Sequence, residues 1–199
     1  MRVVRLALIC VVVLGICLRG ARGSCDISDP GDLLYGLANP ADCGGVVNIL
    51  GNMNVTNPSS YTIGGNVTIT STSITPPVLT FRQQDFTASL IPSVFYVPPT
   101  VPSGTQVIIE NIVIELENTD QSVPIIASDP SAFGRAFRSE AKGVNIEFNS
   151  VTFTSVNGPS LVEVPSPTAG GGGGLIRIVD GGVVSLQNVR FGSSFVDSE

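Results

Sequence analysis

Residues 104–114 read GTQVIIENIVI, residues 143–153 read GVNIEFNSVTF, and residues 182–191 read GVVSLQNVRF. A fourth segment, residues 65–74, reads GNVTITSTSI and follows the same pattern. Each has a leading glycine, a short alternation of apolar and polar residues, a small polar residue and a closing apolar residue. Because alternation with a period of two buries one face of an extended strand, each segment predicts two short β-strands separated by a bend.

The four segments form an internal repeat, since their leading glycines Gly65, Gly104, Gly143 and Gly182 are evenly spaced along the chain. One such unit cannot bury its own apolar face, whereas stacked copies share a buried interior. We therefore predict an all-β chain whose segments stack as a parallel β-helix, a solenoid, with a short N-terminal capping helix. A β-sandwich of short strands is the alternative fold.

The period, roughly 39 residues, has two interpretations: two turns of roughly 20 residues each, or one turn with a long excursion. The first is favoured, because Gly45-Val-Val-Asn-Ile49 repeats the opening of the fourth segment and lies about half a period before Gly65. Ile74, Ile114, Phe153 and Phe191 are interpreted as equivalent closing residues.

The bend between the two strands of a segment requires left-handed backbone geometry, which asparagine tolerates better than most residues. Asn111 and Asn188 occupy this place in the second and fourth segments, and Ser71 occupies it in the first. In the third segment both Asn149 and Ser150 fit the position, so the register there stays open.

Residues 1–23 predict a secretory signal peptide. Arg2 and Arg5 precede an apolar run over residues 6–18, which is too short to span a bilayer comfortably, and small residues follow it. A signal anchor is the alternative, because Arg19 and Arg22 are unusual beside a cleavage site. The expected location of the protein is extracellular, with no transmembrane helix left after removal of the signal.

Residues 24–44 predict an N-terminal cap. Cys25 and Cys43 are the two cysteines outside the signal peptide, and an oxidising compartment favours a disulfide between them. The sequence Asp29-Pro30-Gly31-Asp32 is a helix-start signal, and the short helix it opens has its apolar face formed by Leu33, Leu34 and Leu37. We expect this helix to cover the first turn, whose sheet edge would otherwise be bare.

Residues 45–199 hold the repeats, and no covering element is evident after the last one. Two alternatives follow: the repeats are a fragment of a longer solenoid, or chains pair end to end.

The chain has 10 Lys and Arg against 16 Asp and Glu. Loss of the four arginines in the signal peptide changes the net charge from −6 to −10, which argues against nucleic acid as a partner. The sequence does not fix the oligomeric state.

Two sequons for N-glycosylation are present. They are Asn54-Val55-Thr56 and Asn66-Val67-Thr68, and in a secreted protein each asparagine is a candidate surface acceptor.

The chain resembles secreted right-handed parallel β-helix proteins of the pectin-lyase-like fold. The resemblance rests on residues 32–38 (DLLYGLA) leading into residues 44–49 (GGVVNI), and on Val-x-Leu-x-Asn-Val-x-Phe units such as residues 184–191. It covers roughly residues 25–195. It implies a structural, adhesive or carbohydrate-binding role at the cell surface or in the extracellular matrix, with polysaccharide or matrix components as partners. The same fold hosts polysaccharide lyases, which is the alternative function.

The residues needed for catalysis are incomplete. The chain has no histidine, which excludes a Ser-His-Asp triad and an imidazole base and removes the histidine motif of the galacturonan hydrolases that share this fold. A lyase would need calcium ligands and an arginine base, for which Arg177 and Arg190 are candidates. Candidate ligands are Glu110, Glu115, Glu117, Asp120 and Glu147.

These carboxylates predict a solvated surface better than a calcium site. Glu110 aligns with Thr70, Asn149 and Gln187 in the other segments, which are outward positions of a strand. We therefore expect no resident metal or cofactor, with calcium as the alternative, and a non-catalytic protein rather than an enzyme.

One polar segment, residues 129–142, is a candidate binding loop. It holds Arg135, Arg138 and Lys142, half of the six basic residues outside the signal peptide. One interpretation is a site for a carboxylated sugar or a protein partner. The other, which we prefer, is a surface insertion anchored by Phe133 and Phe137.

Overall fold

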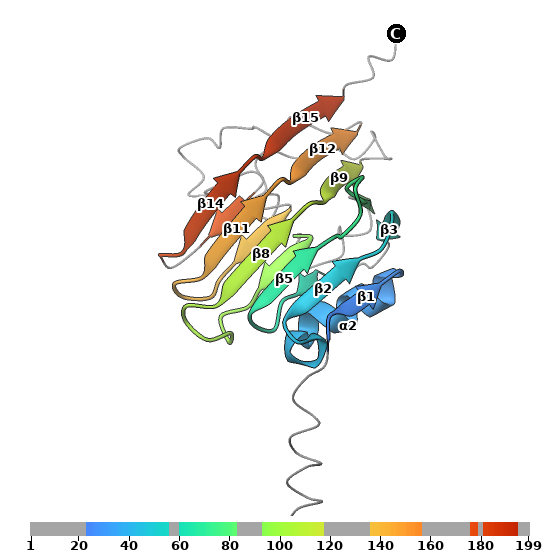
Figure 1. Cartoon of the computed structure of the whole chain (residues 1–199). Helices are drawn as coiled ribbons and strands as arrows, with labels where there is room; N and C mark the ends of the chain where they lie inside the picture. Colours follow the sequence, from blue (N-terminus) through green and yellow to red (C-terminus); the bar gives the residue numbers. More distant parts are fainter. Residues whose placement is uncertain are drawn as a thin grey trace, which may run out of the picture.

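The computed structural model describes residues 23–55, 60–82, 93–117, 136–156, 176–178 and 181–194. This part of the chain is mostly β-strand with little helix, and its strands form three sheets (Figure 1). Every strand pairing among the described residues is parallel. An antiparallel β-sandwich, the alternative from sequence, does not describe these sheets.

The strands are divided among three sheets, numbered 1 to 3. Sheet 1 consists of β1 (Cys25–Ile27), β2 (Val46–Ile49), β5 (Val67–Thr70), β8 (Gln106–Glu110), β11 (Asn145–Asn149) and β14 (Val183–Gln187). Sheet 2 consists of β3 (Met53–Val55), β6 (Val78–Arg82), β9 (Val113–Glu117), β12 (Thr152–Val156) and β15 (Arg190–Ser194). Sheet 3 consists of β4 (Tyr61–Thr62), β7 (Phe95–Val97), β10 (Phe137–Ser139) and β13 (Ile176–Ile178).

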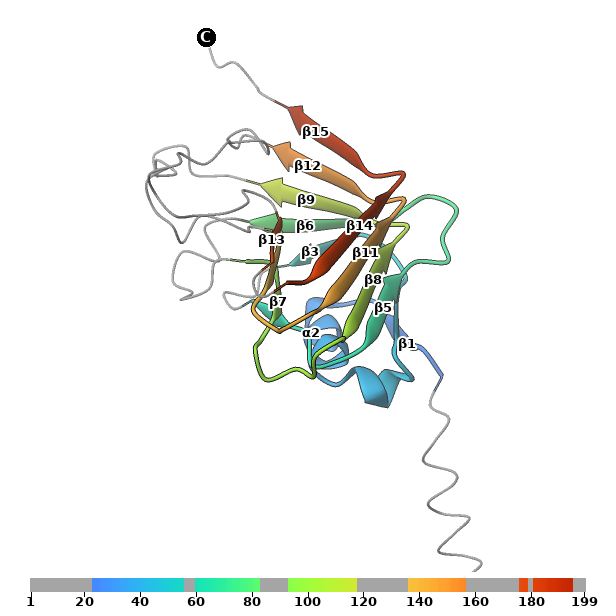
Figure 2. The same ribbon diagram turned by 90° about the vertical axis from the view of Figure 1, so that its left-hand side faces the viewer.

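From β2 onward the chain visits sheets 1, 2 and 3 in that order and then returns to sheet 1 (Figure 2). The predicted stacking of the segments is confirmed by the register of sheet 1. Ile69 pairs with Ile109, Ile109 pairs with Phe148, and Phe148 pairs with Leu186, so that each strand lies beside its equivalent in the next segment. One period of the repeat is therefore one circuit through three sheets. The interpretation as two turns is wrong, because the loops between strands take up the remaining residues.

The predicted bend geometry is confirmed in two segments and corrected in one. Asn111 and Asn188 have positive φ angles of 55° and 54°. In the third segment the left-handed residue is Ser150, at 55°. Ser71 is not among the residues with positive φ, and its Oγ instead donates a hydrogen bond of 2.8 Å to the carbonyl of Ile49.

The first segment also departs from the expected closing residue. Ile74 is fully exposed, and the residue that pairs with Ile114 is Leu79. The reason is that Pro76 and Pro77 lie in a loop between β5 and β6, which moves the second strand further along the chain. Proline has no amide hydrogen to donate to a strand ladder, so this stretch does not pair as a strand.

The interior is one continuous apolar core shared by the three sheets. A chain of aromatic rings runs through it from one circuit to the next, with ring centroids 5.4–6.4 Å apart. Its members are Tyr61, Phe81, Phe95, Phe137, Phe148, Phe153 and Phe191. Edge-to-face and offset contacts at these distances are the favoured geometries of aromatic pairs, so each circuit is packed against its neighbours.

The N-terminal end of the stack is covered by helix α2 (Pro30–Ala38), which contacts strands of all three sheets. Asp29 is its N-cap, since Asp29 Oδ1 accepts hydrogen bonds from the amides of Gly31 (2.8 Å) and Asp32 (3.0 Å). The predicted helix and its start are confirmed. Leu33 and Leu37 are fully buried as expected, whereas Leu34 is partly exposed.

A 3-10 turn, η1 (Pro40–Cys43), follows α2 and carries the second cysteine. The predicted Cys25–Cys43 disulfide is present, with Cα atoms 4.9 Å apart. This disulfide ties β1 to the end of the cap. Strand β1, which was not expected from sequence, pairs in parallel with β2. Residues 1–22, which hold nearly all of the predicted signal peptide, lie outside the described residues.

Candidate functional site

The outer face of sheet 3 carries a polar network of three described side chains. Phe95 and Phe137 point into the core, and the strand alternation places Tyr96 and Arg138 on the opposite face. Tyr96 pairs with Arg138 in the ladder. Residues paired in this way across successive strands form a column, which continues from Tyr96 to Thr62 and from Arg138 to the backbone of Arg177.

Glu140 joins these two side chains into what is called here the Tyr96–Arg138–Glu140 network. Tyr96 Oη donates a hydrogen bond of 2.7 Å to Glu140 Oε2, and Arg138 Nε donates one of 3.1 Å to Oε1. Arg138 Nη2 also forms an ion pair with Oε1. The side chains of Arg138 and Glu140 are 18% and 29% exposed. The network is therefore reachable from solvent, but its two charges neutralise each other.

The protonation of Tyr96 follows from this environment. The pKa of Tyr96 is raised to about 12. Burial is the largest cause, and the hydrogen bond to Glu140 and the negative charge of Glu140 raise the pKa further. Tyr96 is thus a neutral hydrogen-bond donor at physiological pH. Tyr61 in the core beneath has its pKa raised by burial alone.

The predicted binding loop is placed only in part. Arg135 and Phe133 lie outside the described residues. Arg138 belongs to strand β10 and is held by Glu140, while Lys142 is exposed in the turn that follows. Phe137 is fully buried, as expected of an anchor. No contact between Arg138 and Lys142 is seen, so these two cations do not form one cluster in the described part of the chain.

Tyr96 is the member of the network that sequence reasoning missed. It lies 44 residues before Glu140, and the parallel pairing of β7 with β10 is what brings the two together. The only signal in the sequence is the strand-favouring composition of Phe95–Val97, a stretch too brief to mark a strand on its own.

The candidate calcium ligands lie on different faces. Glu110 and Glu147 are on the outer face of sheet 1, in separate columns, while Glu115 and Glu117 are on sheet 2. Glu115 Oε1 accepts a hydrogen bond of 2.9 Å from Thr80 Oγ1. Within the described ranges, no group of three or more Asp, Glu, Cys or His residues can hold a metal ion. Asp120 lies outside those ranges.

The column predicted for Glu110 is confirmed, since Asn149 pairs with both Glu110 and Gln187, and Thr70 occupies the same column one circuit earlier. The candidate bases are not near these acids in the ladders. Arg190 is exposed on β15 of sheet 2, and Arg177 belongs to β13 of sheet 3. The arrangement expected of a lyase is thus not assembled by the described residues.

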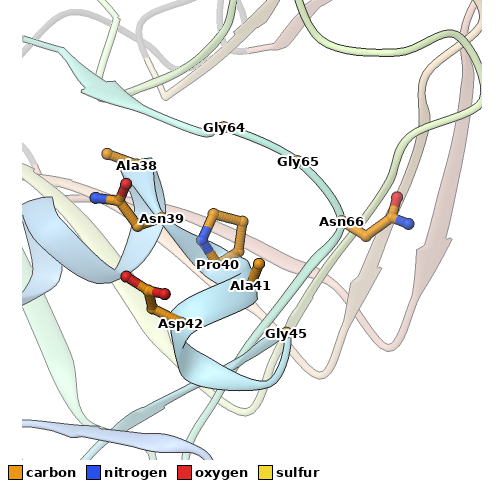
Figure 3. A pocket seen from close by; sticks show the side chains of 9 residues that line it. All are labelled: Ala38, Asn39, Pro40, Ala41, Asp42, Gly45, Gly64, Gly65 and Asn66. Carbon is orange, nitrogen blue, oxygen red and sulfur yellow. The ribbon is translucent and has the colours of Figure 1, made fainter. Parts of the chain in front are cut away.

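A shallow groove of about 550 Å³ lies between the cap and the start of β5 (Figure 3). Its residues are Ala38, Asn39, Pro40, Ala41, Asp42, Gly45, Gly64, Gly65 and Asn66. Asp42 Oδ2 accepts a hydrogen bond of 2.6 Å from Tyr35, and Asn66 Oδ1 accepts one of 2.8 Å from the amide of Gln106. Figure 3 shows the Asn66 side chain turned away from Asn39 and Asp42, so the polar groups do not converge on one point.

Both sequon asparagines are exposed. Asn66 stands on the rim of the groove, and Asn54 is on the outer face of β3, although Thr56 of its sequon is outside the described residues. The geometry leaves both asparagines accessible as glycan acceptors, and glycosylation of either one stays a prediction.

Comparison with known proteins finds no match to the chain among family models, curated proteins or solved structures. In the part of the chain that is described, no helix has the length and hydropathy needed to cross a bilayer. The Cys25–Cys43 disulfide is compatible with an extracellular environment.

Proposed function

We propose that this chain is a secreted right-handed parallel β-helix of the pectin-lyase-like type that acts without catalysis. Its role is structural or adhesive, and it binds carbohydrate or matrix components at the cell surface. The observation that carries this proposal is the register of the three parallel sheets, because equivalent residues of successive circuits form straight columns on each outer face.

The outer face of sheet 1 is the surface best suited to a repetitive ligand. Thr70, Glu110, Asn149 and Gln187 form one column, and Gln106 and Asn145 form part of another. Neighbouring strands of a sheet are about 4.8 Å apart, so this face offers hydrogen-bonding groups at regular intervals. Such a row supports many weak contacts with an extended chain, in which avidity replaces a single deep pocket.

The charges favour a neutral polysaccharide over an acidic one. Arg138 is neutralised by Glu140, and the described columns of sheet 1 contain carboxylates but no cation. A polyanion would meet repulsion there, whereas the hydroxyl groups of a neutral glycan can both donate to carboxylates and accept from amides.

Affinity electrophoresis of the purified secreted chain in gels that contain neutral polysaccharides tests the proposal. We expect retardation of the chain, and less retardation when Thr70, Asn149 and Gln187 are all changed to alanine. A matched control changes Thr152 and Arg190 on sheet 2 to alanine, with circular dichroism to show that both variants are folded. Absence of retardation with neutral glycans and of binding to matrix proteins, or an equal loss in both variants, would contradict the proposal.

Catalysis is tested separately. We expect no calcium-dependent rise in the absorbance of unsaturated uronates when the chain is mixed with pectate or alginate. A rise that is abolished by chelation of calcium would contradict the non-catalytic part of the proposal and favour a lyase.

A further inference from the structure

The end of the stack opposite α2 is formed by three edge strands, β13, β14 and β15 (Figures 1 and 2). Each of them pairs with one neighbour in the sheet orders of the described residues. Within the described ranges the outer edges of these strands are unpaired. A free strand edge is the feature through which strands of another chain add to a sheet.

Apolar side chains that are buried in the previous circuit are exposed at this end. Val184 pairs with Ile146, Leu186 with Phe148, and Phe191 with Phe153. The three last-circuit side chains Val184, Leu186 and Phe191 are 39%, 51% and 50% exposed, whereas Ile146, Phe148 and Phe153 are 2%, 0% and 0% exposed. These three side chains therefore occupy positions that belong to the core in the previous circuit, but no further circuit of described residues covers them.

The same end carries little charge in an acidic chain. Strand β14 reads VVSLQ and has no charged residue, and residues 181–194 contain one arginine and no Asp or Glu. Two copies of a chain with net charge −6 repel each other over most of their surface, but not through this edge.

The sequence of β14 is complementary to itself in an antiparallel ladder. When two copies pair with Ser185 opposite the partner's Ser185, Val184 lies opposite the partner's Leu186 and Val183 opposite the partner's Gln187. Residues that are directly opposite in a ladder share a face, so both Val184–Leu186 pairs fall on the inner face and continue the core.

We propose that a second copy of this chain docks on the open end through β14, forming a closed two-fold dimer centred on Ser185. This contact is isologous, because it uses the same strand edge of both copies, and the end that carries α2 and the Cys25–Cys43 disulfide takes no part in it. The assembly therefore stops at two copies and does not grow into a filament. This inference is independent of the proposed function.

Disulfide trapping tests the register of the dimer. In the proposed ladder the Cα atoms of Ser185 and the partner's Ser185 are about 4.5–5.5 Å apart, within the range that a disulfide spans. Ser185→Cys in the secreted full chain is expected to give a covalent dimer on mild oxidation, with the cross-link mapped by mass spectrometry. Gln187→Cys is the matched control on the same strand. Its two copies would be offset by four residues, or about 13 Å, and should remain uncross-linked.

The association itself is measured by light scattering coupled to gel filtration over a range of concentrations. We expect a monomer–dimer equilibrium for the wild-type chain and a shift towards monomer for Leu186→Lys. Ser185→Lys places two ammonium groups face to face on the outer side without touching the core, so it weakens the dimer even if Leu186→Lys fails to fold. A wild-type chain that stays monomeric at its highest soluble concentration, open-ended oligomers, or equal cross-linking of Ser185→Cys and Gln187→Cys would each overturn the proposal.

Discussion

The two ends of the stack are built from the same kind of strand but differ in their cover. At the N-terminal end α2, β1 and a disulfide enclose the first circuit, and Leu33 and Leu37 are fully buried. At the other end Leu186 and Phe191 are half exposed at positions that are core one circuit earlier. The apolar side chains of a circuit are therefore fully buried only where another layer covers them, as expected for a repeat architecture.

The largest expected effect compares two stacked rings. Phe153 is fully buried and its ring centroid is 5.6 Å from that of Phe191, which is half exposed. Phe153→Ala is expected to lower the free energy of unfolding by about 3–5 kcal/mol, because it leaves a cavity in the core. Phe191→Ala should cost about 1 kcal/mol, since much of its ring is already in water. Urea unfolding at low protein concentration, where the proposed dimer is dissociated, gives both values. Equal losses would show that Phe191 is covered as well as Phe153 is.

The second effect concerns the disulfide of the covered end. Its cysteines are 18 residues apart, and replacing both with serine is expected to cost about 3 kcal/mol by the chain-entropy model. Hydrogen exchange locates the loss. Amides of β1 and β2 should exchange faster in the double variant, whereas those of β12 should change by less. Uniform acceleration along the whole stack would mean that the cap and the later circuits unfold as one unit.

The third effect tests how closely the cap approaches the sheets. A Cβ on Gly64 would lie 2.2 Å from the carbonyl oxygen of Ala38, a backbone atom at the end of α2. Gly64→Ala is therefore expected to lower the free energy of unfolding by about 1–3 kcal/mol through overpacking. Gly51→Ala is the matched control, because nothing lies within 4 Å of its Cβ position, and it should stay within about 0.5 kcal/mol. If thermal unfolding shows no loss of stability in Gly64→Ala, the end of α2 can move away from residue 64 at little cost.

Sheet 1 and the cap could be predicted because their signals are local. From β5 onward, paired residues of sheet 1 are separated by a nearly constant number of residues, so Ile109, Phe148 and Leu186 align in the sequence itself. Strands β1, β2 and β5 follow one another at shorter intervals. The bend residues Asn111 and Asn188 and the N-cap Asp29 are likewise determined by their own side-chain chemistry.

Sheet 3 and its polar network could not be predicted, because loops of unequal length precede its strands. Fewer residues separate Thr62 from its pair Tyr96 than separate Tyr96 from Arg138, and the separation of Arg138 from Arg177 is intermediate. A search for one fixed period therefore finds the first sheet and not the third. The misplaced Ile74 has the same cause, since the loop containing Pro76 and Pro77 shifts the strand without disturbing the apolar pattern.

The smallest expected effect lies between the two ends, at Tyr96. The ordinary tyrosine pKa is about 10, and burial raises the pKa of Tyr96 to about 12. A phenol whose pKa is raised on folding contributes stability that is fully present below pH 10 and is lost as the pH rises towards 12. Tyr96→Phe removes this ionisation, so its free energy of unfolding should fall less steeply with pH over that interval than that of the wild type. Urea unfolding at a series of pH values measures the two slopes.

Glu140→Gln separates the two causes of the Tyr96 shift. Burial is the larger cause and the variant preserves it, while the charge of Glu140 disappears, so most of the alkaline loss should persist. A Glu140→Gln slope as shallow as that of Tyr96→Phe would mean that the charge of Glu140 dominates. Identical slopes for Tyr96→Phe and the wild type would mean that the hydroxyl of Tyr96 is not sequestered from water.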